Sequence, residues 1–138
     1  VERADDQIIL YIREGATKEQ REVAMREWYR AEMKALIAVL VARWEAVIGV
    51  KARRISIKRM RTIWGSCNHR THDINFNLEL MKKPLHCIEY VVVHELCHRK
   101  EMNHSVRFWA MVEKLQPDYK LSRKWLKDHG DALIARLP

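Results

Sequence analysis

The longest stretch of helical periodicity in the sequence runs from Thr17 to Gly49. Between Val23 and Ile48, apolar residues recur every three or four positions, as they do on one face of an α-helix. Thr17 and Gln20 have the spacing of a capping box, in which each side chain satisfies a backbone N–H at the helix start. Gly49 suits the left-handed residue that ends many helices. The pattern predicts one long amphipathic helix whose Trp and Met side chains belong to the core.

Three shorter segments have the pattern of β-strands. Residues 7–13 are rich in β-branched and apolar side chains and end near Gly15, which predicts a strand. Residues 54–59 and 73–78 each alternate with a period of two, and the polar segment 64–69 lies between them. This arrangement predicts two antiparallel, half-buried strands joined by a loop.

The C-terminal half has the pattern of consecutive helices. Residues 87–100 are long enough for about four turns, and residues 105–115 predict a second helix with a serine as its N-cap. Residues 122–128 and 130–137 predict short closing helices. Together with the strands, these elements indicate the α+β class, with a small antiparallel or mixed sheet packed on the long helix and on the helix over 87–100.

The composition fits a single globular domain over residues 1–138. Hydrophobic residues make up 48% of the chain and charged residues 32%, which excludes a disordered or low-complexity protein. The longest apolar run, residues 35–42, is far shorter than the ~20 residues that cross a bilayer, so we expect no membrane span. An odd number of cysteines without framework spacing favours free thiols and a cytoplasmic protein.

The formal net charge of +8 permits binding to nucleic acid or to an acidic partner. The basic residues are densest from Lys51 to Arg61, where no acidic residue occurs. This segment lacks the interleaved aromatic residues on which bases stack, so a short strand with solvated basic flanks is the simpler interpretation. Nucleic-acid binding is therefore weakly supported.

The segment from His94 to His98 has the H-E-x-x-H pattern of a metal site on a helix. Residues i and i+4 lie on one helix face, so both imidazoles can reach one ion. Glu95, beside the first histidine, can hydrogen-bond a water held there and act as a general base. His104 follows six residues later, so the helix must end near residues 101–102 and turn back. Asn103 suits this break because Asn tolerates the left-handed conformation.

Three histidine ligands, His94, His98 and His104, leave one coordination position open, which is typical of catalytic zinc. Cys97 faces away from the two helical histidines, and we interpret it as a small buried residue. Cys67, His69 and His72 could form a second zinc site but lack a fourth ligand, so a polar loop beside the active site is favoured.

Several of these segments together resemble a known family, the YgjP-like zinc metallopeptidases, which are related to the SprT-like group. The resemblance is most specific from about residue 61 to residue 109. It rests on Trp64-Gly65-Ser66-Cys67, Ile74-Asn75-Phe76-Asn77, Tyr90-Val91-Val92-Val93-His94-Glu95-Leu96-Cys97-His98 and Asn103-His104-Ser105 with Phe108-Trp109. It implies a zincin-like fold, a zinc ion held by His94, His98 and His104, and Glu95 as the catalytic acid/base.

Two departures qualify the resemblance. Members of this family carry a β-rich N-terminal part, and because the chain begins with Val1 rather than Met we expect a fragment that lacks this part. The histidine spacing also equals that of metzincins, but Glu101 stands where those enzymes have Gly, which excludes that label.

The expected reaction is hydrolysis of a peptide bond in a peptide or an unstructured protein, with Glu95 moving the proton. We expect an extended substrate to add to the sheet along residues 73–77. His69, His72 and Arg107 are candidate oxyanion stabilisers from proximity in sequence alone. The alternative function is a basic, zinc-stabilised module that binds nucleic acid or a protein without hydrolysis.

Overall fold

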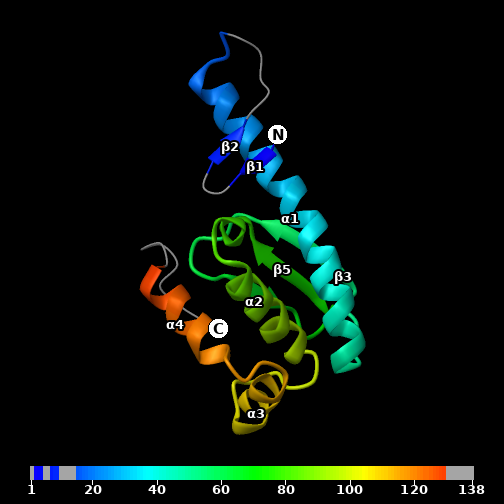
Figure 1. The fold of residues 1–138 in the computed structure, drawn as a ribbon. Coiled ribbons are helices and arrows are strands. Elements are labelled where there is room, and N and C mark those ends of the chain that lie inside the picture. The colour runs from blue at the N-terminus through cyan, green and yellow to red at the C-terminus, as the bar shows by residue number, and fades with distance from the viewer. Residues whose placement is uncertain (1, 5–6, 10–14, 130–138) are drawn as a thin grey trace.

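The computed structural model of the chain describes residues 2–4, 7–9 and 15–129 (Figure 1). The elements follow in the order β1 (Glu2–Ala4), β2 (Gln7–Ile9), α1 (Lys18–Ile48), β3 (Arg54–Lys58), β4 (Gly65–Cys67), β5 (Asp73–Asn77), the 3-10 helix η1 (Leu78–Lys82), α2 (Leu85–Cys97), α3 (Val106–Leu115) and α4 (Tyr119–His129). The α+β class predicted from the sequence is confirmed.

The main sheet has three strands in the order β3-β5-β4. β4 pairs with β5 antiparallel, with Ser66 opposite Asn75. β3 pairs with β5 in parallel, with Ile55 opposite Ile74. The predicted antiparallel pairing of residues 54–59 with 73–78 is therefore wrong. The turn over residues 68–72 joins β4 and β5 as an antiparallel hairpin. β3 pairs with the other edge of β5, in the parallel direction.

The buried side chain of Asn77 holds the segment that connects β3 to β4. Its Nδ2 group donates to the carbonyls of Met60 and Ile63, both at 2.8 Å, and its Oδ1 accepts from the Glu79 N–H at 3.0 Å. Asn77 is fully buried, so these three bonds replace the water that its amide would otherwise need. The Asn77 side chain thus holds the segment between β3 and β4 against the end of β5, and it also caps η1.

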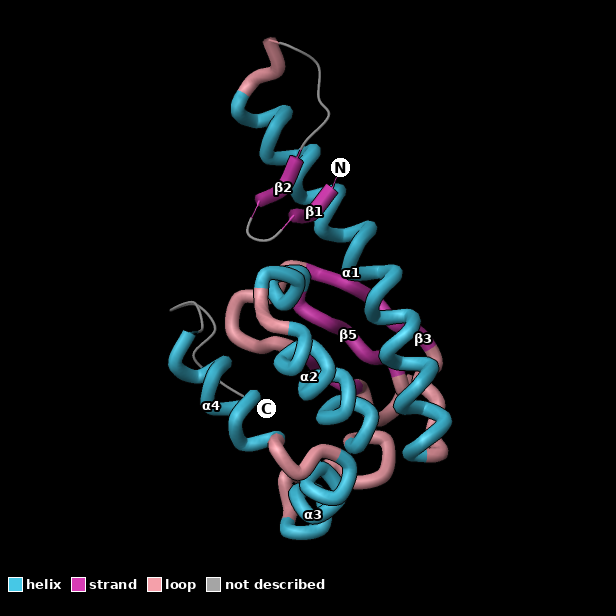
Figure 2. The backbone as a smooth tube through the Cα atoms, viewed as in Figure 1, coloured by secondary structure: helices cyan, strands magenta, loops and turns pink. Residues whose placement is uncertain are grey.

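The helices cover the sheet as Figures 1 and 2 show, with α2 lying across one face of the sheet and α1 running alongside β3. The core is formed where these elements meet, and Val91, Val92 and Val93 of α2 have no exposed surface. The N-terminal half of α1 extends beyond the sheet, because 31 helical residues span about 46 Å. No described helix is long and apolar enough to span a membrane.

The predicted helix boundaries are largely confirmed. The capping box of Thr17 with Gln20 is present in α1, and Gly49 ends that helix at φ 81°. The strand predicted over residues 7–13 is seen as β2, and its remaining residues lie outside the described part of the chain. The closing helix predicted over 122–128 is the longer α4, and that over 130–137 also lies outside.

Candidate metal centre

Three histidine side chains meet at the C-terminal end of α2. His94 and His98 lie one turn apart on that helix, and His104 lies in the loop before α3. Their Nε2 atoms are 3.0 Å (His94 to His104), 3.1 Å (His98 to His104) and 3.2 Å (His94 to His98) apart. No other group of three His, Cys, Asp or Glu side chains within the described ranges is close enough to share an ion.

The triangle of nitrogens fits a tetrahedral zinc ion. Zinc–histidine bonds of about 2.0–2.1 Å place two ligand nitrogens about 3.3 Å apart at the tetrahedral angle, close to the distances between the His94, His98 and His104 nitrogens. Three converging ring nitrogens cannot all donate hydrogen bonds to one another, so a shared cation explains the cluster better than mutual hydrogen bonding. Imidazole ligands suit zinc and other transition metals.

The opposite ring nitrogens of both helical histidines have partners. His98 Nδ1 lies 3.0 Å from the carbonyl oxygen of Glu101, and His94 Nδ1 lies 3.4 Å from the hydroxyl of the buried Tyr90. A carbonyl accepts only, so His98 carries its hydrogen on Nδ1 and leaves Nε2 free for a cation. Such outer contacts fix the tautomer and orientation of metal-binding histidines.

Aromatic side chains of α3 back the imidazoles. The ring of Phe108 stacks on His98 at 4.5 Å and meets His94 edge-on at 4.8 Å, and Trp109 stacks on His104 at 5.7 Å. Helix α3 is capped as predicted, with Ser105 Oγ accepting the N–H of Phe108 at 3.2 Å. The cap positions the aromatic face directly after His104, and the packed rings restrict the rotamers of all three imidazoles.

The turn between His98 and His104 differs from the sequence prediction. Helix α2 ends at Cys97, several residues earlier than predicted, and tighter turns follow it, with Arg99 N–H bonded to Leu96 O at 3.0 Å. Asn103 does not adopt the left-handed conformation, which His72 alone adopts among the described non-glycine residues. The early end of α2 brings His104 back to the triad without a special residue at the break.

The side chain of Glu95 projects from α2 towards Gly65 of the edge strand β4. Its side chain is almost fully buried, with 2% of its surface exposed. A Cβ atom placed on Gly65 would lie 3.0 Å from Glu95 Cγ and 3.1 Å from Oε2. The absence of a side chain at Gly65 therefore makes room for the glutamate beside the histidine cluster.

Burial dominates the protonation of the site. It lowers the pKa of His94 to about 2, and the charges of His98, His104 and Arg123 act in the same direction. Burial also lowers the pKa of His98 and His104 and raises the pKa of Glu95 to about 8. Neutral imidazoles are the form that binds metal, so the site is prepared for a cation at neutral pH.

Comparison with known proteins agrees with this geometry. Residues 1–129 match the family described as YgjP-like, metallopeptidase domain. The chain belongs to the YgjP-like metallopeptidase family. Its fold is similar to the metallopeptidase zymogen of Pyrococcus abyssi abylysin, with 18% identity, a TM-score of 0.63, and coverage of 71% of this chain and 98% of that chain. No curated protein matches the sequence.

Membership of the YgjP-like family makes this chain a metallopeptidase, and the three converging histidines are where it can hold an ion. Cys97 is buried and free, as predicted. Trp64 is fully buried and is a packing residue. Cys67 is a free thiol, and burial, assisted by the Glu95 charge, raises its pKa to about 11, which disfavours the thiolate that binds metal.

One residue near the site, Arg123 of α4, is not predicted by the sequence patterns. Its guanidinium lies 5.1 Å from the centre of the Trp109 ring, and its charge contributes to the lowered pKa of His94. Of the residues expected nearby, His69 lies 6.2 Å from His98 between ring centres, and Arg107 forms an ion pair with Glu101 at 4.0 Å. No sequence signal marks Arg123, because α4 reaches the site only through tertiary packing.

Proposed function

We propose that this metallopeptidase is a zinc-dependent enzyme with a zincin-like site, in which His94, His98 and His104 bind the ion and Glu95 is the general base. The observation that carries the proposal is the cluster of three Nε2 atoms within 3.0–3.2 Å, beside a buried glutamate on the same helix. Three ligands leave one position open for water or substrate, as catalytic zinc requires.

Bound zinc would supply an activated water and a Lewis acid for the substrate carbonyl. The carboxylate of Glu95 then accepts a proton from the attacking water and delivers it to the leaving amine. Burial alone favours the protonated form of Glu95, whereas a cation at the histidine cluster favours the carboxylate. With an ion held by His94, His98 and His104, Glu95 would keep its carboxylate form and act as the base at neutral pH.

The free edge of β4 is the place for an extended substrate. Residues 73–77 form β5, which is the central strand, so the predicted addition of substrate there is wrong. On β4, Trp64 O and Asn68 N–H bond to β5, and alternation directs the backbone groups of Gly65 and Cys67 to the opposite side. A peptide paired with these groups would pass beside Glu95, which packs against Gly65.

Arg123 is the best-placed side chain to stabilise negative charge on the substrate carbonyl oxygen. It is exposed, lies over Trp109, and contributes to the lowered pKa of both His94 and His104. Arg123→Met should lower kcat at least tenfold and leave zinc affinity unchanged. Lys124→Met is the matched control, because Lys124 pairs with Asp128 on the same helix at 2.7 Å. An equal loss of kcat in both variants would show that Arg123 has no specific role in catalysis.

The decisive experiment on the proposed function is Glu95→Gln. The variant should keep the fold and the zinc content but lose hydrolysis of an unstructured protein such as casein. Retention of parental activity would refute the assignment of Glu95 as the base.

The ligand assignment is tested separately. His104→Ala should lose zinc at a chelator concentration that the parent protein withstands, and His69→Ala, a histidine close to the cluster but outside it, should keep zinc. Equal zinc affinity in His104→Ala and the parent would exclude the three-histidine site.

The alternative, a non-hydrolytic basic binding module, makes different predictions. It requires affinity for DNA or RNA that falls steeply with salt and is the same in Glu95→Gln. The cytoplasmic location that we propose fits the three free cysteines. Expression with a thiol-labelling probe in cells would test whether they stay reduced.

A further inference from the structure

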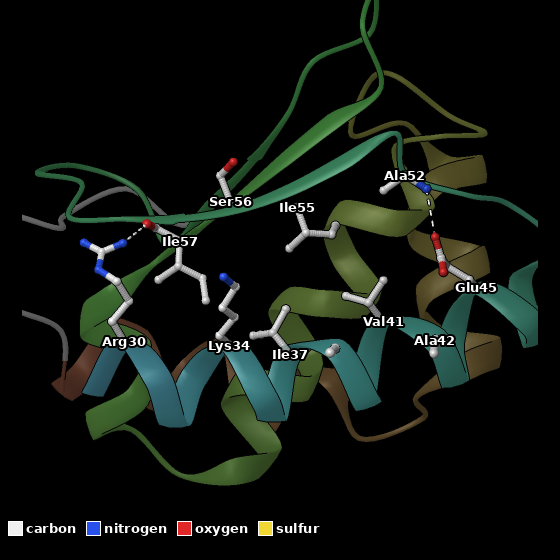
Figure 3. A pocket seen from close by; sticks show the side chains of 11 residues that line it. Arg30, Lys34, Ile37, Val41, Ala42, Glu45, Ala52, Ile55, Ser56 and Ile57 are labelled. Carbon is white, nitrogen blue, oxygen red and sulfur yellow. Dashed lines mark hydrogen bonds between the residues drawn. The ribbon is translucent and has the colours of Figure 1, made fainter. Parts of the chain in front are cut away.

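A groove of about 600 Å³ lies between α1 and β3, on the edge of the sheet away from β4 (Figure 3). Apolar side chains from both elements line it: Ile37, Ala38, Val41 and Ala42 from α1, and Ile55 and Ile57 from β3. The two alanines are exposed, so small side chains leave this part of α1 uncovered. An apolar cleft of this size is typical of binding sites rather than of a packed core.

Polar contacts close the groove at both ends. At one end Arg30 of α1 donates to the carbonyl oxygen of Ile57, and at the other Glu45 accepts the N–H of Ala52 at 2.9 Å. Figure 3 shows the two contacts on either side of the apolar section, with Lys34 between Arg30 and Ile37. The groove therefore offers a stretch of β3 edge of defined length.

The backbone of β3 has free hydrogen-bonding groups along this stretch. Asn77 N–H and Asp73 O of β5 bond to the β4 side, so alternation turns Ile74 and Phe76 towards β3. Ile55 lies opposite Ile74, and in a parallel pair the residue opposite a bonded residue directs its own N–H and C=O outward. Ile57, opposite Phe76, follows the same rule, and its carbonyl accordingly points away from β5 and accepts from Arg30 of α1.

Basic side chains flank the β3 edge on both faces of the sheet. Lys34 of α1 lines the groove (Figure 3), whereas Arg54 and Lys58 alternate with the two isoleucines of β3 that line it and so lie on the opposite face of the strand. All three are exposed, and no ion pair joins any of them to a carboxylate in the described part of the chain. The one acidic lining residue, Glu45, already accepts the Ala52 N–H. The dense basic run seen in the sequence thus surrounds an open sheet edge.

These charges select the occupant. A second copy of β3 paired antiparallel about Ser56 would place Arg54 opposite Lys58, and like charges directly opposite destabilise a strand pair. The groove lining contains no aromatic side chain on which a nucleic-acid base could stack. An extended segment with apolar and acidic side chains in alternation would place its apolar side chains in the groove and its acidic side chains on the opposite face, beside Arg54 and Lys58, while its backbone pairs with the free groups of β3.

We propose that the β3 edge and its groove form a docking site for an acidic, extended segment of a partner protein, which adds to the sheet as a fourth strand. The site lies on the opposite edge of the sheet from β4 and Glu95, so it does not rest on the proposed hydrolytic function. Apolar side chains of the segment fill the groove over Ala38 and Ala42, and its acidic side chains face Arg54 and Lys58.

The test uses a synthetic seven-residue peptide that alternates glutamate with valine, with binding measured by fluorescence anisotropy. The Glu95→Gln variant serves as the background so that the probe is not cleaved. Ala38→Leu fills the groove with a good helix-forming residue and should weaken binding at least tenfold. Val39→Leu is the matched control, because Val39 is 58% exposed and does not line the groove. Lys58→Glu should also weaken binding at least tenfold.

Two control probes separate strand addition from other binding. The same peptide methylated on alternate backbone nitrogens should lose binding, because methylation removes the N–H groups that pair with β3. A peptide with lysine in place of glutamate should not bind. The proposal is overturned if the Glu95→Gln protein does not bind the glutamate–valine peptide, if the methylated peptide binds equally well, if Ala38→Leu binds as tightly as Val39→Leu, or if only a single-stranded oligonucleotide binds the surface.

Discussion

Gly65 is the position where a single methyl group should separate metal binding from catalysis. In Gly65→Ala the new Cβ would lie 3.0 Å from both Glu95 Cγ and Val91 Cγ1. Ordinary carbon contacts are about 3.5–4.0 Å, so these neighbours must move by a few tenths of an ångström. Val91 is fully buried in α2, whereas Glu95 has a flexible side chain that can yield. We therefore expect the carboxylate of Glu95 to be displaced.

The magnitude follows from overpacking and misplacement. An extra methyl in a packed site costs about 1–3 kcal/mol of folding stability, and the smaller entropy of the unfolded Ala chain offsets about 0.4–1 kcal/mol of that. A misplacement of about 1 Å lowers a catalysed rate by about 10²-fold, so a shift of a few tenths of an ångström should lower activity by a smaller factor. The contacts of Gly65 are with Glu95 and Val91 and not with the histidines, so zinc affinity should be unchanged.

Three measurements check this prediction: urea unfolding, zinc competition with a chelator, and casein hydrolysis. Ser66→Ala is the control on the same strand, since it removes one hydroxyl that accepts from Asn75 at 3.2 Å and adds no atom near Glu95. Val91→Ala combined with Gly65→Ala removes one of the two clashes, so the double variant should lose less stability than the sum of the two single losses. A Gly65→Ala protein with parental activity and stability would refute the packing argument.

Three further predictions concern the support of the site. Asn77→Ala leaves two partly buried carbonyls and one N–H without their side-chain partner and should cost about 2–4 kcal/mol in urea unfolding, whereas Asn75→Ala, with one side-chain bond, should cost less. Ser105→Ala removes the cap of α3 and should cost about 1 kcal/mol, together with a measurable loss of zinc affinity because the cap adjoins His104; unchanged affinity would mean that the cap does not position the ligand. The Arg53 hydrogen bond, assisted by its charge, lowers the pKa of Asp73, so this pair stabilises the fold above the unfolded carboxyl pKa and the benefit is lost as pH falls through the folded value. The stability difference between Asp73→Asn and the parent should therefore be largest near neutral pH and vanish in acid, and a difference independent of pH would contradict the linkage.

Local patterns in the sequence determined the helices and the chemistry of the site. The i and i+4 spacing of His94 and His98 places both on one face of any helix, whatever surrounds it. The capping residues Thr17 and Ser105 act within one turn of chain, and both are seen where the sequence predicts them. Such features depend on neighbours three or four residues away, which a sequence displays directly.

Tertiary structure alone decided the sheet order and the outer parts of the site. The period-two pattern of a strand carries no information about its partner, so the parallel pairing of β3 with β5 could not be read from residues 54–58. The position of Arg123 over Trp109 and the room that Gly65 leaves for Glu95 also join residues far apart in the chain. The sequence identified the atoms that can bind a metal, and long-range packing decided that Gly65 of β4 and Arg123 of α4 lie near them.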